Sequence, residues 1–341
     1  MSDKKLRFGV AGVGGVGQGH VSAILASEYA ILTALCDPLG EKIHEERAAR
    51  KMPPIGIEGL PVFTDFDAFI SSGLVDCIVI SAPDALHCRY TVTALEHGID
   101  VLCEKPLTVT DEESAAIMDA VRRTGRKAYA GQICRFAPAF VKARELLGTG
   151  MIGELFCVEA MYCHGCHKDL PKDNWRFFPP RHATSCGGCH AIDILRYFAG
   201  DPDTVFAFGN RKCRTDWSVE DCSETVLKFP DGTVGRVLTT LGVIAPYSMQ
   251  TSLYGTAGTI FTNNVANEVV VHTAAGKTVY PVEVNTHNSR AEIDSMCRSI
   301  LYGDPVCHDI IEGAKTLVVC NAAIRSIGSG LPEKPDYACL A

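Results

Sequence analysis

The chain has 341 residues, and its 32 Lys and Arg against 40 Asp and Glu give a formal net charge of −8. Hydrophobic residues at 47% and charged residues at 21% exclude a largely disordered chain, and a net-acidic chain without a basic block is not expected to bind nucleic acid. Apolar stretches such as Cys77–Ala82 are too short to span a membrane, and Met1–Lys5 lacks a secretory pattern. We therefore expect a cytoplasmic protein of two domains.

Residues 6–130 alternate short β-branched runs with helical patterns. Strands are predicted at Arg7–Ala11, Ile31–Cys36, Cys77–Ser81, Asp100–Cys103 and Lys127–Ala130, and helices near Gly17–Ser27, Glu41–Arg50, Cys88–His97 and Asp111–Arg123. Strands that alternate with helices indicate a parallel sheet with helices on both faces. The sequence therefore predicts an α/β, doubly wound Rossmann domain over residues 1–130.

Residues 131–341 follow a different rhythm, with strand-like runs joined by short turns. The runs are Leu155–Tyr162, Thr204–Asn210, Glu224–Phe229, Thr233–Thr240, Gln250–Tyr254, Glu268–Thr273 and Lys277–Val284. They predict an α+β domain with an open, mainly antiparallel sheet. A helix with apolar residues from Ile293 to Leu301 is expected to cover one sheet face and to end before Gly303. An apolar sheet face must be covered, so we expect a homo-oligomer, a dimer or tetramer, formed through this sheet.

A glycine-rich segment follows the first predicted strand. Gly12, Gly14 and Gly17 form a G-x-G-x-x-G pattern before a helix, where they suit a tight turn, close approach of a pyrophosphate and helix packing. Asp37 lies 20 residues after Gly17 at the end of the second strand, where a carboxylate would bind a ribose 2′-hydroxyl. Pro38 offers no cation for a 2′-phosphate. The pattern therefore predicts NAD, in preference to NADP, as cofactor.

Three further segments carry a resemblance to a known family. They are Val79–His87 followed by Glu104-Lys105-Pro106, then Gly187–Asp193, and then Tyr254–Thr259. Together they resemble the E-K-P motif, the G-x-H-x-x-D segment and a late hairpin of the Gfo/Idh/MocA oxidoreductases. The resemblance extends over nearly the whole chain. It implies an NAD(P)-dependent dehydrogenase or reductase that acts on a sugar, cyclitol or glycoside.

By position, the resemblance implies that Lys105 and His190 are catalytic. A neutral His can take the hydroxyl proton, and a Lys can stabilise the developing negative charge on the same oxygen. The family often has an Asp four residues before this His, and here Cys186 stands there. The resemblance assigns cofactor binding to Gly12, Gly14, Val16, Gly17, Asp37, Ala82, Pro83, His87, Glu104 and Lys105, and substrate binding to Arg135, Trp175, Arg176 and Asp193. Glu104 is expected to be structural rather than catalytic, and Asp193 could instead orient His190.

The chain has 16 cysteines, many of them in apolar runs, and we expect reduced thiols. Cys163 and Cys166, and then Cys186 and Cys189, form two C-x2-C pairs with the spacing of a four-cysteine zinc site. A cysteine-rich chain produces such pairs by chance, and the family motif at Cys189 needs no metal. We expect no metal and keep the four-cysteine site as the alternative.

Three functions are compatible with these residues. The first is an NAD-dependent dehydrogenase of a sugar, cyclitol or glycoside. The second is NAD-dependent glycoside cleavage by oxidation, elimination and reduction, which would use the same Lys105 and His190. The third is a non-enzymatic regulator that senses NAD or a sugar, and the presence of both Lys105 and His190 argues against it.

Overall fold

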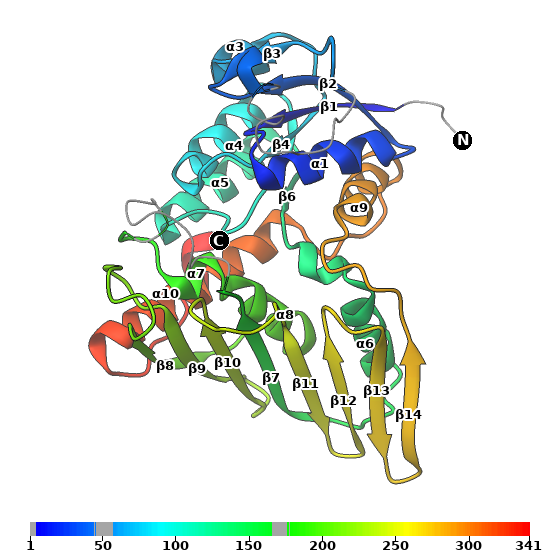
Figure 1. Cartoon of the computed structure of the whole chain (residues 1–341), viewed down its shortest axis with the longest axis vertical. Coiled ribbons are helices and arrows are strands. Elements are labelled where there is room, and N and C mark those ends of the chain that lie inside the picture. The colour runs from blue at the N-terminus through cyan, green and yellow to red at the C-terminus, as the bar shows by residue number, and fades with distance from the viewer. Residues whose placement is uncertain (1–4, 44, 46–56, 166–175, 177) are drawn as a thin grey trace. The chain divides into compact units, whose positions relative to one another are not determined.

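The computed structural model describes residues 5–43, 45, 57–165, 176 and 178–341, and it divides the chain into two compact units (Figure 1). The first unit comprises residues 1–108, 112–131 and 289–313, and the second comprises residues 109–111, 132–288 and 314–341. Each unit is built around its own sheet. Among the described residues, no helix is both long and apolar enough to cross a membrane.

The first unit contains a six-stranded, fully parallel sheet. Its strands, in the order β3-β2-β1-β4-β5-β6, are β3 (Val62–Phe63), β2 (Ala30–Cys36), β1 (Leu6–Ala11), β4 (Cys77–Ile80), β5 (Asp100–Cys103) and β6 (Ala128–Ala130). The four side chains of β4 are all 0% exposed, because strands inside a parallel sheet are covered on both faces. The predicted Rossmann sheet is confirmed, and β3 is a strand that the sequence analysis missed.

Helices accompany this sheet. They are α1 (Gly15–Ala26), α3 (Phe66–Ser71), α4 (His87–Glu96), α5 (Asp111–Thr124) and α9 (Ser289–Tyr302), with short 3₁₀ turns η1 (Gly40–Lys42) and η2 (Asp84–Leu86). Of these, α3 was not predicted. Most of the helix predicted at Glu41–Arg50 lies outside the described residues.

The position of α9 corrects one expectation. This helix was expected to cover the antiparallel sheet, but it packs on α1 in the first unit. Its apolar residues Ile293, Met296 and Cys297 are fully buried in one cluster with Val21 and Ile24 of α1. The apolar stripe was identified correctly, and its partner surface was wrong, because periodicity shows that a face is buried but not against what.

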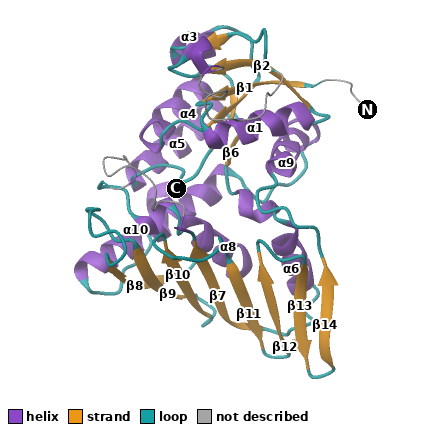
Figure 2. Cartoon of the chain, in the orientation of Figure 1, coloured by secondary structure: helices purple, strands orange, loops and turns teal. Residues whose placement is uncertain are grey.

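The second unit contains an eight-stranded, mostly antiparallel sheet (Figure 2). Its order is β14 (Gly276–Pro281), β13 (Glu268–Thr273), β12 (Gly258–Asn263), β11 (Gln250–Gly255), β7 (Leu155–Cys163), β10 (Val234–Thr240), β9 (Cys222–Lys228) and β8 (Thr204–Asn210). Among the described strands of this sheet, only the β7–β10 pair is parallel. The open, mainly antiparallel domain is confirmed, and β12 is an additional strand.

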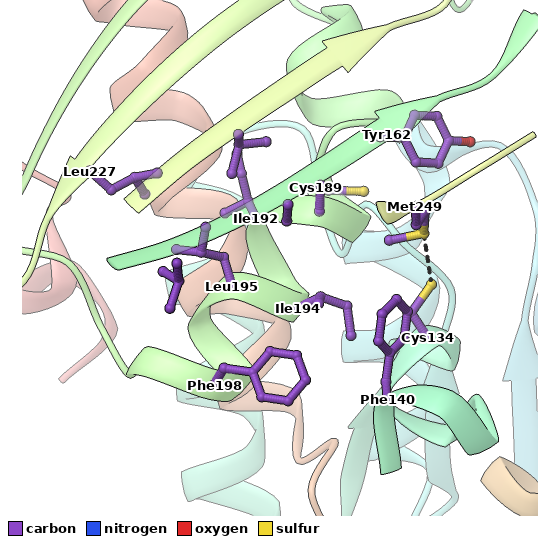
Figure 3. Packing of buried hydrophobic residues seen from close by; sticks show 14 of the residues in the cluster. Cys134, Phe140, Tyr162, Cys189, Ile192, Ile194, Leu195, Phe198, Leu227 and Met249 are labelled. Atoms are coloured by element: carbon purple, nitrogen blue, oxygen red, sulfur yellow. Dashed lines mark hydrogen bonds between the residues drawn. The ribbon is translucent and has the colours of Figure 1, made fainter. Parts of the chain in front are cut away.

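One face of this sheet carries the core. Along the register, Val205, Leu227, Val158, Leu253, Ile260 and Val271 form a row across the sheet, and each is at most 1% exposed. Helices α8 (Cys189–Ala199) and α6 (Pro138–Gly148) pack on this face, α8 on β7 and β10 and α6 on β12 and β13. Figure 3 shows Ile192 and Leu195 of α8 in this core. The chain also forms η3 (Ile133–Phe136), α7 (Ala183–Cys186), α10 (Ile310–Ser329) and η6 (Tyr337–Leu340).

Candidate active site

The glycine-rich loop follows β1 and leads into α1. Gly12 has a φ of +85°, and a Cβ there would lie 2.6 Å from the backbone nitrogen of Ala82. A Cβ on Gly17 would collide with the Gly12 carbonyl oxygen, so both positions require glycine for packing. At Gly14, by contrast, a Cβ would have no atom of the described residues within 4 Å. This open space at the N-terminus of α1 fits the approach of a phosphate group.

Asp37 immediately follows β2 and is 9% exposed. Its Oδ2 accepts a hydrogen bond from Val13 N at 2.8 Å, and its Oδ1 accepts one from Leu39 N at 3.0 Å. The carboxylate therefore lies against the glycine-rich loop, where the spacing had placed it. Val16, in the first turn of α1, is 53% exposed. These residues fit a dinucleotide.

His87 joins the loops that follow β4 and β5. Its Nε2 lies 2.9 Å from the carbonyl oxygen of Ala82, and its Nδ1 lies 2.9 Å from that of Pro106. Carbonyl oxygens only accept hydrogen bonds, so a protonated imidazole satisfies both. Burial opposes the charge, but the Cys103 side chain and the two carbonyls raise the pKa of His87 to about 9. His87 thus holds together the loops that contain Ala82, Pro83 and the E-K-P motif.

Glu104 braces the backbone of Lys105. It is 6% exposed; its Oε1 lies 2.7 Å from His20 Nε2, and its Oε2 accepts a hydrogen bond from Lys105 N at 3.1 Å. Burial alone would raise the pKa of Glu104, but the hydrogen bond and charge of His20, with Lys105, hold it below the ordinary value. Lys105 itself is half-buried, two residues beyond β5, at the carboxyl edge of the parallel sheet. That edge is where such sheets bind ligands.

A second buried carboxyl group lies in the same unit. Glu292 on α9 is 0% exposed, and neither carboxyl oxygen has a hydrogen-bond partner among the described residues. Burial, with a smaller contribution from the negative charge of Glu104, raises the pKa of Glu292 well above its ordinary value. The pKa values of Glu292 and Glu104 are therefore shifted in opposite directions.

In the second unit, His190 is the second residue of α8 and is 5% exposed. Its Nδ1 lies 3.4 Å from the sulfur of Cys134 in η3, and its ring stacks on Tyr162 of β7 with centroids 5.7 Å apart and an interplanar angle of 21°. The sequence analysis identified neither neighbour. Cys134 is 56 residues away from His190, and no motif connects them.

Arg135 and Asp193, both predicted to bind substrate, are paired with each other. The Arg135 Nε and NH2 groups donate to the two oxygens of Asp193 at 2.9 and 2.7 Å, and both side chains are 3% exposed. Thr316 also donates to Asp193 Oδ1 at 2.9 Å. The pair fastens η3 to α8, the elements that carry Cys134 and His190. Contact of either residue with substrate stays a prediction.

Of the remaining predicted site residues, some lie within the described part of the chain and others do not. Trp175 and Cys166 lie outside the described residues, and Arg176 is partly exposed. Cys163, Cys186 and Cys189 are present as thiols. Within the described ranges, no three His, Cys, Asp or Glu side chains are grouped as metal ligands. With Cys166 outside those ranges, the four-cysteine alternative is still open.

The buried acid generates a prediction about stability and pH. An unfolded Glu ionises near pH ~4.3, whereas folded Glu292 keeps its proton to higher pH, so the folded state binds more protons above that value. The free energy of unfolding should therefore fall by about 1.4 kcal/mol per pH unit until the folded-state pKa is passed. Glu292→Gln should remove this slope. Urea unfolding between about pH 5 and about pH 6 measures it, because at higher pH His87, with its pKa of about 9 in the folded protein, adds a slope of the same sign.

The matched control is Glu28→Gln, which changes an exposed carboxylate of the same unit. It should leave the pH slope as it is in the parent protein. Equal slopes for the parent protein and Glu292→Gln would show that Glu292 is ionised in the folded state.

Comparison with known proteins identifies the family. Residues 6–132 match an oxidoreductase family with an NAD-binding Rossmann fold, and residues 140–261 match the GFO/IDH/MocA C-terminal domain. D-xylose 1-dehydrogenase (NADP(+)) 2 of Haloferax volcanii is 27% identical, with 97% of this chain and 100% of that protein covered. The scyllo-inositol 2-dehydrogenase (NAD(+)) of Bacillus subtilis is 26% identical, with 98% and 97% covered.

Among solved structures, levoglucosan dehydrogenase in complex with NADH and levoglucosan has the same fold. Its TM-score is 0.87 at 21% identity, with 98% of this chain and 100% of that chain covered. The two family matches lie in the expected order, and together they cover most of the sequence. This chain belongs to the GFO/IDH/MocA oxidoreductase family.

Proposed function

We propose that the protein is an NAD-dependent dehydrogenase that oxidises a secondary hydroxyl of a sugar, cyclitol or glycoside. The observation that carries the proposal lies in the first unit. Lys105 is held by Glu104 at the carboxyl edge of the sheet whose other loops contain Gly14 and Asp37. A group that can stabilise negative charge thus accompanies a loop that fits a dinucleotide. The named activities of the sugar and inositol dehydrogenase relatives support the substrate class.

The residues of the chain have distinct roles in this proposal. Gly12, Gly14, Gly17 and Asp37 hold the dinucleotide, which when bound supplies the acceptor for the hydride. His190 takes the hydroxyl proton as general base, and its 5% exposure keeps the imidazole largely away from water. Lys105 donates a hydrogen bond to the oxygen on which negative charge develops.

A substrate screen tests the proposal. Sugars, cyclitols and glycosides are offered with NAD, and NADH absorbance is followed. Accumulation of NADH supports a dehydrogenase. Consumption of a glycoside without accumulation of NADH indicates oxidation, elimination and reduction, and NAD binding without any hydride transfer indicates a regulator.

Asp37 is expected to produce a preference for NAD over NADP. Its carboxylate repels a 2′-phosphate, and the next residue, Pro38, offers no compensating cation. Asp37→Asn removes the charge and keeps an oxygen that can accept from Val13 N, so it should narrow the preference by roughly 10-fold, or ~1.4 kcal/mol. Competitive titration of the two nucleotides measures this. Tighter binding of NADP by the parent protein would refute the assignment.

Lys105 and His190 are expected to support the chemical step rather than cofactor binding. Lys105→Ala and His190→Ala should each lower kcat strongly with NAD affinity nearly intact, and general-base loss at His190 is expected to cost about 10²–10⁴-fold. If they act as a unit, the double variant loses far less than the product of the single losses. Steady-state kinetics and NAD titration measure these effects. Lys277→Ala and His97→Ala, which remove an exposed Lys and an exposed His, are the controls and should not change kcat. Unchanged kcat in either site variant would remove that residue from the mechanism.

We also propose that the protein self-associates through the outer face of the eight-stranded sheet. Opposite the buried row, the register aligns Phe206, Val226, Arg236, Glu159, Ser252, Phe261, Val270 and Val279. Phe208, on the same face, is 66% exposed, and Val226 is 44% exposed. A second copy of the chain would cover these apolar side chains, and on this face Arg236 is already paired with Glu159 and Glu224.

Sedimentation of the purified protein should therefore give a dimer or tetramer of the 36.7 kDa chain. Phe208→Lys should weaken this association, because it places an unpaired charge in the covered face. The control is Ile244→Lys, which introduces the same charge at a 97% exposed apolar residue in the loop after β10, outside the sheet face. This variant should associate as the parent protein does. A parent protein that sediments as a monomer at all concentrations would contradict the proposal.

A further inference from the structure

The thiol of Cys134 lies at the Nδ1 side of the His190 ring. Its sulfur is 3.4 Å from Nδ1, and it is 1% exposed. The same sulfur lies 3.6 Å from the sulfur of Met249, which is 0% exposed (Figure 3). The hydroxyl of Tyr247 donates to that methionine sulfur at 3.2 Å. Three sulfur and hydroxyl contacts therefore form a short chain that ends at the imidazole.

The chemistry of these groups sets the direction of the hydrogen bonds. A thioether has no proton and only accepts, so the contact with Met249 is a hydrogen bond when the S–H of Cys134 points to it. The single thiol proton is then committed, and the Cys134 sulfur can only accept from His190. In this arrangement Nδ1 carries the proton. In a neutral imidazole this leaves Nε2 as the unprotonated nitrogen with the lone pair.

We propose that Cys134 is a positioning residue that holds neutral His190 in the tautomer with the proton on Nδ1 and the lone pair on Nε2. The mechanistic value of this tautomer depends on the proposed function, in which His190 is the base. Only an unprotonated Nε2 can take the hydroxyl proton there. The opposite tautomer would have to lose its own proton first.

The surroundings of His190 maintain this arrangement. The bidentate pair of Arg135 and Asp193 fastens η3, which contains Cys134, to α8, which contains His190. Tyr162 of β7 stacks on the ring and limits its rotation. The ionisable groups that contact the imidazole thus include the Cys134 thiol and the Tyr162 phenol. No step of the proposal requires a change of charge on any of them.

The sequence analysis indicated a different cysteine as the neighbour of His190. Cys186 occupies the position where the family often has Asp, and it is the rival candidate for the partner of His190. The thiol that lies 3.4 Å from Nδ1 is that of Cys134. A matched pair of serine substitutions, Cys134→Ser and Cys186→Ser, distinguishes the two. At position 134, serine keeps a hydrogen-bond acceptor and alanine removes it. Cys134→Ser can therefore be compared with Cys134→Ala to see whether an acceptor alone restores the effect.

The test reads the tautomer directly. Long-range ¹H–¹⁵N spectra of the protein labelled in histidine distinguish Nδ1–H from Nε2–H, and His190→Gln assigns the signal. In the parent protein at a pH where His190 is neutral, we expect the Nδ1–H form. Cys134→Ala should lower the ratio of Nδ1–H to Nε2–H by about three- to tenfold, the size expected for one neutral hydrogen bond. Cys134→Ser should restore the ratio, and Cys157→Ala, a thiol in β7 that points to the other sheet face, should not change it.

Kinetics provide the second measurement. With an active substrate, Cys134→Ala should lower kcat by about the same three- to tenfold factor and leave the KM for NAD unchanged. An Nε2–H signal in the parent protein would overturn the proposal, as would a ratio that responds to Cys186→Ser and not to Cys134→Ala. The spectra need no turnover, so the two proposals fail separately. An Nδ1–H signal in a protein whose kcat does not respond to His190→Ala would refute the role of His190 as base and leave Cys134 as its partner.

Discussion

The buried ion pair between Arg135 and Asp193 is the constraint on which the second unit's candidate site depends. The residues are 58 positions apart, and both side chains are 3% exposed. Breaking such a pair by removing one partner leaves an uncompensated buried charge and costs about 3–5 kcal/mol. Its geometry is bidentate, so it fixes orientation as well as distance between η3 and α8. Cys134 directly precedes Arg135 in η3, and His190 lies three residues before Asp193 in α8. The ion pair therefore holds the two segments that contain Cys134 and His190.

The first unit applies the same principle around Lys105 with different groups. Glu104 connects His20 on α1 to the backbone of Lys105, and His87 connects the loops after β4 and β5. Both connections bring a charged side chain to a backbone atom of the E-K-P segment. A buried charge is tolerated here because each one has a partner. Thus each candidate catalytic side chain is adjacent to a residue that is fixed by buried polar contacts.

The sequence was sufficient for the parallel sheet and for the glycine-rich loop because these depend on local patterns. Strands buried on both faces produce continuous apolar runs such as Cys77–Ile80, and the spacing from Gly17 to Asp37 follows from the length of one helix and one strand. The partner of α9 and the pairing of Cys134 with His190 depend on contacts between residues far apart in the chain. A thiol in an apolar context looks the same in sequence whether it only packs or accepts a hydrogen bond. Arg135 and Asp193 were recognised as notable residues, but their contact with each other has no signature in spacing.

A thiol next to His190 has a physical explanation in the charge balance of the second unit's interior. A carboxylate in the place of Cys134, which is 1% exposed, would be a second buried anion in the unit that already buries Asp193, and the Arg135 guanidinium is already paired with both oxygens of Asp193. Burying an anion without its own cation is costly, whereas a neutral thiol packs against Met249 as a small apolar group. The thiol also stabilises an imidazolium less than a carboxylate does.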